Sequence, residues 1–142
     1  MTRFIDSLLT NYWFWLLARV LLSVVFLSSG LAKLLDFQGG MNEMQQAGLS
    51  PTWLFNVLTI VTLLTGSVLL LLDRAIWLGA AILIAFLLLS IVIVHHFWSL
   101  PEAQAMTSLY VALEHMSVIG GLMAASIASQ LRKKISGKSH AQ

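Results

Sequence analysis

The sequence lacks cysteine and has few charged residues. Its 142 residues include no cysteine, 2 prolines, 8 lysines and arginines, and 6 aspartates and glutamates. Without cysteine the chain forms no disulfide and performs no thiol chemistry, whatever the redox state of its compartment. So few charges leave too little polar surface to cover a soluble domain of this length. The scarcity of basic residues also argues against nucleic-acid binding.

Hydrophobic residues instead make up 58% of the chain, and the mean hydropathy is +0.88. They form four stretches of about twenty residues or more, enough to cross a hydrocarbon core of about 30 Å as helices. We therefore predict an all-α integral membrane protein, an antiparallel four-helix bundle. The predicted transmembrane helices cover residues 12–33, 53–72, 75–96 and 107–131. They form one domain, 1–131, followed by a basic tail, 132–142.

Basic residues gather on one side of the predicted bundle. That side carries Arg3, Arg74, Arg132, Lys133, Lys134 and Lys138, and the other side carries Lys33. By the positive-inside rule we expect both termini in the cytoplasm and a multi-pass protein of the bacterial inner membrane. The basic tail would then face the anionic lipids of the cytoplasmic leaflet.

The one long connection, residues 34–52, contains several glycines and Pro51. These breakers bracket Met41 to Ala47, for which we predict a short helix on the outer surface. The other connections are short, which makes neighbouring helices antiparallel.

Small and polar residues recur at helical spacing along the fourth predicted helix. The stripe consists of Thr107, Tyr110, Glu114, Ser117, Gly121, Ala125 and Ala128. In lipid such a stripe marks the surface that packs on other helices, so we expect Glu114 to face the bundle interior. His115 lies about 100° away from Glu114 and shares its side with Leu122, so we expect it near lipid or another subunit.

Ionised groups inside a bilayer are costly unless they are paired or hydrated. One interpretation is that Arg19 and Glu114 form a direct or water-bridged pair that fixes helix packing, while Lys33 reaches the headgroups. The other is that Glu114 accepts protons below an outward-facing cavity, with His95 or His96 relaying them.

The two adjacent histidines also allow a structural interpretation. His95 and His96 would cap the helix at the interface, with Phe97 and Trp98 in the aromatic belt. Sequential histidines do not readily share one metal from a regular helix, which argues against a metal or haem site.

Several short motifs together resemble the DoxX family of small four-helix membrane proteins. They are Ala18-Arg19, the run Gly30 to Leu34, His95-His96-Phe97-Trp98 and Gly120-Gly121. The resemblance implies an inner-membrane protein of the group that includes the membrane subunit of a thiosulfate:quinone oxidoreductase. The family pattern has an acid in helix two and a Lys-Asn pair in helix four, whereas this chain has Thr62 and Glu114-His115.

The combined prediction is a membrane subunit of a quinone-linked oxidoreductase system. The candidate cofactor is a quinone near the outer helix ends, with its tail between Phe26 and Phe86. Its hydrogen-bonding and proton-transfer groups would be Arg19, Lys33, His95, His96 and Glu114. Besides the lipid bilayer, the candidate partners are a redox protein that supplies electrons and further copies of the chain.

Two alternatives remain open. The first is a noncatalytic anchor or assembly subunit of a larger complex. The second, a proton or small-solute transporter, is less favoured because the four short helices show no broken helix and no paired repeat.

Overall fold

The computed structural model describes residues 2–139, and the side chains of residues 3–136. Within that range it contains helices and no strand. The elements are α1 (Thr2–Thr10), α2 (Tyr12–Leu35), α3 (Phe37–Gln46), α4 (Thr52–Leu71), α5 (Ile76–Ile93), the short 3-10 helix η1 (Phe97–Ser99) and α6 (Glu102–Ser139). The long helices α2, α4, α5 and α6 are apolar enough to cross a membrane, as predicted. The all-α membrane bundle is thus confirmed.

The predicted helix boundaries differ from the observed ones mainly in α5 and α6. Helix α5 ends at Ile93, so His95 and His96 lie beyond it and not inside it as predicted. The Ser99 hydroxyl bonds the carbonyl oxygen and Nδ1 of His96, and this local competition favours the tight turn of η1 over a continued helix. Helix α6 is longer than predicted at both ends, because good helix formers surround its apolar part. It includes residues 132–139 of the predicted tail, whereas residues 140–142 lie outside the described range.

Helix α3 confirms the short helix predicted in the long connection and extends it toward α2. It begins after Asp36, whose carboxylate accepts a hydrogen bond from the backbone N–H of Gly39 at 2.9 Å. It is followed by Gly48, at a φ of +73° that glycine adopts at little cost. Helix α3 packs on α4 and on the end of α2.

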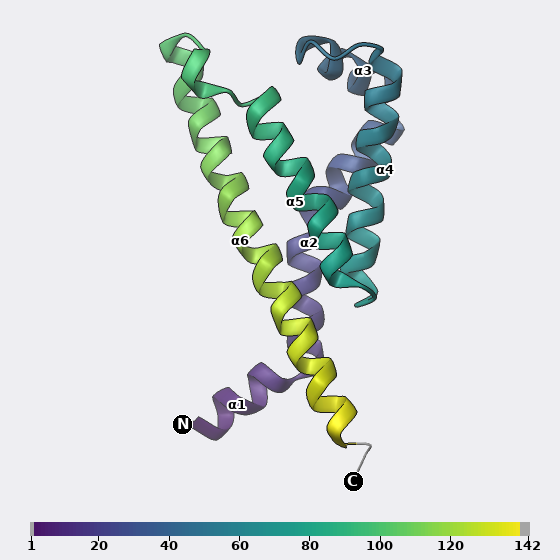
Figure 1. Ribbon diagram of the computed structural model, residues 1–142, viewed down its shortest axis with the longest axis vertical. Helices are drawn as coiled ribbons and strands as arrows, with labels where there is room; N and C mark the ends of the chain where they lie inside the picture. Colours follow the sequence, from purple (N-terminus) through teal and green to yellow (C-terminus); the bar gives the residue numbers. More distant parts are fainter. Residues whose placement is uncertain (1, 140–142) are drawn as a thin grey trace.

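The four long helices form two arms that separate toward one end (Figure 1). Helix α2 packs along α4, α4 packs on α5 and α5 packs on α6, while α6 meets α2 over a short stretch only. We call the end with α1 and the α4–α5 turn the basal end, and the end with α3 and η1 the open end. Both described ends of the chain lie at the basal end (Figure 1).

The core of the bundle consists mainly of leucine side chains, among them Leu63, Leu83 and Leu122, together with other apolar residues. Helices α4 and α5 approach closely where α4 has Gly66. A Cβ atom at this position would lie 2.5 Å from Cγ of Leu83. Small residues let membrane helices pack at short distance, which holds these two helices together below the opening.

Candidate functional site

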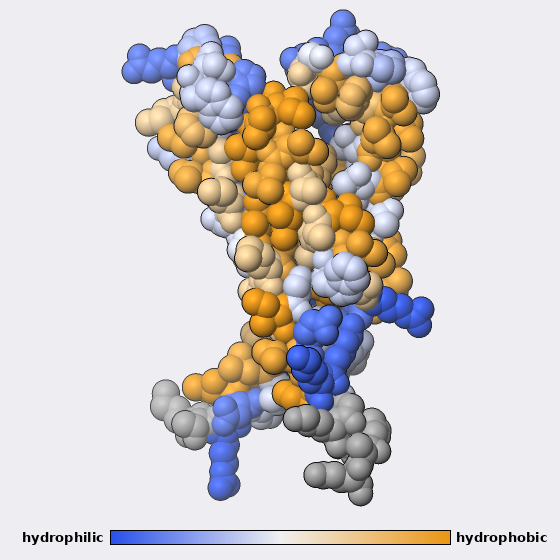
Figure 2. Space-filling view, in the orientation of Figure 1, coloured by the Kyte–Doolittle hydropathy of each residue, from blue (hydrophilic) through white to orange (hydrophobic). Residues whose placement is uncertain are grey.

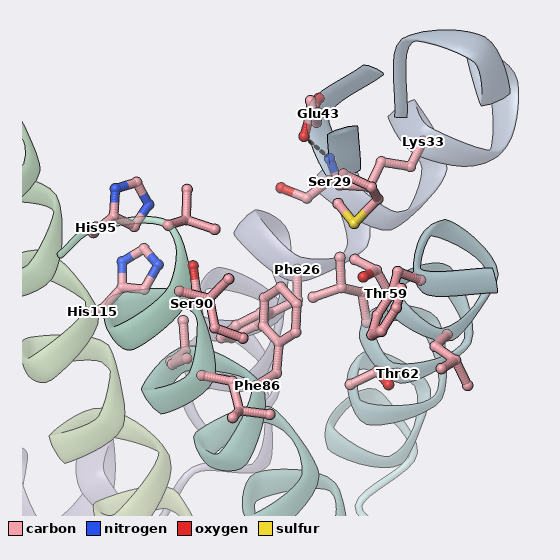
Figure 3. Close-up of a pocket in the computed structure, with 18 of the residues that line it drawn as sticks. Phe26, Ser29, Lys33, Glu43, Thr59, Thr62, Phe86, Ser90, His95 and His115 are labelled. Carbon is pink, nitrogen blue, oxygen red and sulfur yellow. Dashed lines mark hydrogen bonds and ion pairs between the residues drawn. The ribbon is translucent and has the colours of Figure 1, made fainter. Parts of the chain in front are cut away.

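The opening between the arms contains a cavity of about 630 Å³ near the open end (Figure 3). Side chains of α2, α3, α4, α5 and α6 line it, together with residues that follow α3 and α5. A cavity of this size lies within the range that holds small molecules and cofactors. It brings together residues that the sequence separates by up to about 90 positions, such as Val25 and His115.

The lower wall of the cavity is apolar. Figure 3 shows Phe26 of α2 and Phe86 of α5 at its centre, and Leu63 and Leu87 also line it. Phe26, Leu63 and Leu87 belong to the buried core, so this wall is fixed by helix packing. The wall can therefore accept an apolar group without rearrangement.

Two groups of polar side chains face each other across the cavity (Figure 3). On one side the ammonium group of Lys33 pairs with the carboxylate of Glu43 on α3. The other side carries the rings of His95 and His115. Four hydroxyl side chains also line the cavity: Ser90 lies on the histidine side, Ser29 lies next to Lys33, and Thr59 and Thr62 lie deeper on α4 (Figure 3). The arrangement provides hydrogen-bond donors and acceptors above an apolar wall.

Lys33 lines the cavity and does not extend to the lipid headgroups. Its side chain is only 14% exposed, and it bonds Glu43 within the protein. The expectation that Lys33 merely reaches the headgroups is wrong, because α3 folds back over the end of α2 and supplies a carboxylate. The sequence does place a lysine and a glutamate on either side of a helix break. It could not show that the two side chains meet.

The histidine that faces the cavity is His95. Its ring centroid lies 5.3 Å from that of His115, with the ring planes at 72°. His96 instead bonds the hydroxyl of Ser99 at 2.8 Å and packs beside Trp98, and it does not line the cavity. The structure thus separates two residues that the sequence could not distinguish.

His115 lies on the packed side of α6, contrary to the expectation that it is near lipid or another subunit. Ala112 and Leu122 share this side and are buried, with Leu122 fully covered. The reason is that α6 packs on α5 through the apolar side of the helix. Sequence periodicity identified a distinct side but could not show whether lipid or protein covers it.

Glu114 lies at the edge of the cavity and not in the bundle interior. It lines the cavity, yet its side chain is exposed, as are Tyr110 and Ser117 on the same predicted stripe. The part of that stripe nearer the basal end is packed inside the protein, where Ala125 is buried. The expected inward position fails because the arms have already separated at the level of Glu114. The ion pairs among the described residues do not include Glu114.

Arg19 lies outside the cavity and makes no pair with Glu114. Its guanidinium donates to the carbonyl oxygen of Leu71 at 2.9 Å and lies 3.9 Å from the carboxylate of Asp73. Where α2 and α6 meet, Leu22 lies against Gly121. Arg19 lies three residues from that contact toward the basal end, and Glu114 lies seven residues from it toward the open end. At about 1.5 Å per residue, the two are about 15 Å apart along the helices. The predicted pair is therefore wrong.

The basal end is joined by a polar cluster around Asp73. Its carboxylate accepts hydrogen bonds from Nε1 of Trp15 at 3.0 Å and from the hydroxyl of Ser129 at 2.9 Å. Nζ of Lys133 donates to the backbone carbonyl oxygen of Asp73 at 2.9 Å. The cluster links α2, the α4–α5 turn and α6, so the arms are fastened at one end and separate at the other. Asp73 lies in the short connection between the second and third predicted helices, and nothing in the sequence indicated that it would be the centre of this cluster.

Metal-binding groups are absent from the described part of the chain. No three histidine, aspartate or glutamate side chains there lie close enough to hold one metal ion. His95 and His115 form a pair without a third ligand.

Comparison with known protein families matches residues 14–96 to the DoxX family. The matched range includes Arg19, Lys33, His95 and His96, and it stops before α6. No match was found among the curated proteins or the solved structures that were compared. Since the matched residues make up more than half of the chain and four of its helices are apolar enough to cross a membrane, this is a multi-pass membrane protein of the DoxX family.

Proposed function

We propose that this protein is the membrane subunit of a quinone-linked oxidoreductase system, and that its cavity binds the quinone. The observation that carries the proposal is the cavity itself, which combines an apolar wall with polar groups on two sides. A quinone has the same division, with carbonyl oxygens on its ring and a hydrocarbon tail. Polar groups placed in an apolar pocket fix the orientation of such a ligand.

The residues of the cavity have distinct roles in this proposal. Lys33 donates a hydrogen bond to one carbonyl oxygen of the ring, and His95 or His115 donates to the other. The tail extends along the apolar wall between Phe26 and Phe86. A bound quinone supplies the capacity to accept two electrons and two protons, and the electrons come from a partner protein or an organic donor.

Proton transfer is assigned to the histidine pair and Glu114. His95 and His115 are in ring contact, and Glu114 lines the edge of the same cavity. Imidazole exchanges protons near neutral pH, so this pair can hold or release a proton next to the ring. Arg19 has no part in this step, because it is bound in the basal cluster.

We further propose that the basal end faces the cytoplasm of a bacterium. Arg3, Arg74, Lys133 and Lys134 lie at the basal end, whereas Lys33 lies at the open end. This asymmetry supports the orientation through the positive-inside rule. The cavity then opens toward the periplasm.

Measuring the amount of quinone that copurifies with the protein tests the proposed function. The protein is purified in mild detergent, and quinone is extracted and counted by mass spectrometry. We expect near-stoichiometric quinone in the native chain and a loss of affinity of at least about fivefold in whichever of His95→Ala and His115→Ala removes the hydrogen-bond donor, since leaving a buried polar group without its partner costs about 1–3 kcal/mol. His96→Ala is the matched control, because His96 does not line the cavity. No quinone in the native chain, or equal loss in the folded control, would overturn the proposal.

A noncatalytic assembly subunit is the second candidate. It is favoured by the exposed side of α6 near the open end, where Tyr110, Glu114 and Ser117 are uncovered. Polar residues on a membrane helix hydrogen-bond to neighbouring helices. In that case Glu114→Gln lowers the yield of a copurifying complex and leaves the quinone content unchanged, whereas in the quinone proposal it lowers the quinone content.

A further inference from the structure

Helix α1 is a short helix outside the four spanning helices, with an exposed apolar side. Phe4, Ile5, Leu8 and Leu9 are all large, apolar and more than 40% exposed. At about 100° per residue these four positions cover one side of the helix, and Arg3, Asp6, Ser7 and Thr10 occupy the other. Figure 1 shows that α1 projects sideways from the basal end and does not continue the line of α2.

The direction of α1 is fixed at its junction with α2. Asn11 separates the two helices, and its side-chain oxygen accepts a hydrogen bond from the N–H of Trp13 at 2.7 Å, which caps the start of α2. Arg132 on α6 donates to the carbonyl oxygens of Leu9 and Thr10 at 3.4 and 3.2 Å. A cation at the C-terminal carbonyls of a helix is favourable, so α6 holds α1 at an angle to the bundle.

Aromatic residues place this junction at the level of a membrane surface. Tyr12, Trp13 and Trp77 are exposed at the basal end. Tryptophan and tyrosine gather where the hydrocarbon core meets the headgroups. Figure 2 shows apolar surface on the side of α1 that faces the bundle, and hydrophilic atoms on the side that faces away. The apolar side of α1 therefore begins at the depth where acyl chains begin.

The charge of the basal end complements an anionic surface. Arg3, Arg74 and Lys134 are exposed there. The one acidic group of the turn, Asp73, is already neutralised by Arg19 and Lys133. Basic residues near an anionic leaflet are attracted to its lipid headgroups.

We infer that α1 lies in the plane of the membrane interface, with its apolar side among the acyl chains, and that with the basic residues of the basal end it binds anionic phospholipid. Interfacial helices of this kind sit about 5–10 Å into the boundary between headgroups and chains. Nine residues bind a membrane weakly alone, but α2 keeps this helix at the surface. The inference does not depend on the proposed quinone site.

The absence of native cysteine allows a direct test with spin labels. Single variants Ile5→Cys and Ser7→Cys place a nitroxide on opposite sides of α1 in the full-length protein. The protein is placed in nanodiscs of phosphatidylcholine, alone or mixed with phosphatidylglycerol. Frequent collision of the nitroxide with oxygen shows that the label lies among acyl chains. Frequent collision with a water-soluble nickel complex shows that the label lies in water. We expect the label at position 5 to favour oxygen and the label at position 7 to favour nickel, each several-fold. Equal, aqueous accessibility at both positions would overturn the inference.

Charge variants test the lipid preference separately. We expect phosphatidylglycerol to lower nickel access at position 5, and Arg3→Gln with Lys134→Gln to weaken this effect, since Arg74 remains. Asp6→Asn is the matched control, because it makes α1 more positive. We expect phosphatidylglycerol still to lower nickel access at position 5 in this variant. The side chains of Arg3, Asp6 and Lys134 are exposed and take part in none of the ion pairs among the described residues, so we expect the variants to fold. If phosphatidylglycerol changes nothing in the native chain, or if the double variant responds like the native chain, anionic lipid recognition is wrong.

Discussion

At the residue scale, the carboxylate of Asp73 holds groups from three parts of the chain. It accepts hydrogen bonds from Trp15 and Ser129 and lies within 3.9 Å of both Arg19 and Lys133. The guanidinium of Arg19 in turn lies over the ring of Trp15, 5.5 Å from its centroid. Asp73 does this from a left-handed backbone conformation, with φ at 53°, which aspartate and asparagine adopt more readily than most residues.

We predict that Asp73→Asn lowers the free energy of unfolding by about 1.5–3 kcal/mol, the range for hydrogen bonds to charged groups. Asparagine keeps the backbone conformation and removes the charge that Arg19 and Lys133 face. Reversible unfolding in mixed detergent micelles measures the change. Asp6→Asn is the control, because Asp6 accepts a hydrogen bond from Thr10 through its backbone oxygen and not through its side chain. This substitution should change the free energy of unfolding by less than about 0.5 kcal/mol. Equal stability of both variants would mean that the cluster does not fasten the basal end.

Also at this scale, the sequence identified Arg19 as a buried charge but not its partner. The carbonyl oxygens at the end of α4 lack partners within their helix, and Arg19 reaches two of them together with Asp73. That arrangement depends on how the α4–α5 turn folds, which spacing along the chain does not reveal. Lys33 and Glu43 illustrate the same limit at the open end.

At the element scale, the four spanning helices follow directly from length and hydropathy. Bilayer thickness sets the length of an apolar helix, so α2 and α4 begin and end within two residues of their predicted bounds. The ends of α5 and α6 were less predictable, because they lie near the interface where water and side chains compete for backbone groups. Helix α1 was not predicted, because its nine residues are too few to span a membrane.

Close packing of α4 on α5 yields a prediction about two glycines. We expect Gly66→Ala to destabilise the protein by about 1–3 kcal/mol, because the added methyl group would meet the side chain of Leu83. Gly120→Ala is the matched control. A Cβ atom there has no neighbour within 4 Å, and alanine favours a helix by up to about 1 kcal/mol over glycine.

The unfolding measurement described for Asp73 separates the two glycine variants. The account requires the Gly66 variant to be the less stable. If Gly120→Ala were the more harmful, α6 would be covered on a side that the single chain leaves open, and a further copy or a partner subunit would be implicated.

At the scale of the whole molecule, a fastened basal end and separated arms create the cavity. Sequence reasoning predicted a polar site near one end of the bundle and selected Lys33, His95 and Glu114, all of which line it. It could not find His115 or the contribution of α3, because both depend on how far the arms separate. A stripe of small residues indicates a packing surface, but the angle between helices decides which part of the stripe is covered.

The most direct test of the central claim is photolabelling with a light-activated quinone analogue in the membrane, followed by peptide mapping. If the cavity binds the quinone, the label falls on α2 and α5 around Phe26 and Phe86 and is displaced by excess unlabelled quinone. Label spread over lipid-facing residues such as Leu131, without displacement, would contradict the claim and favour the assembly subunit.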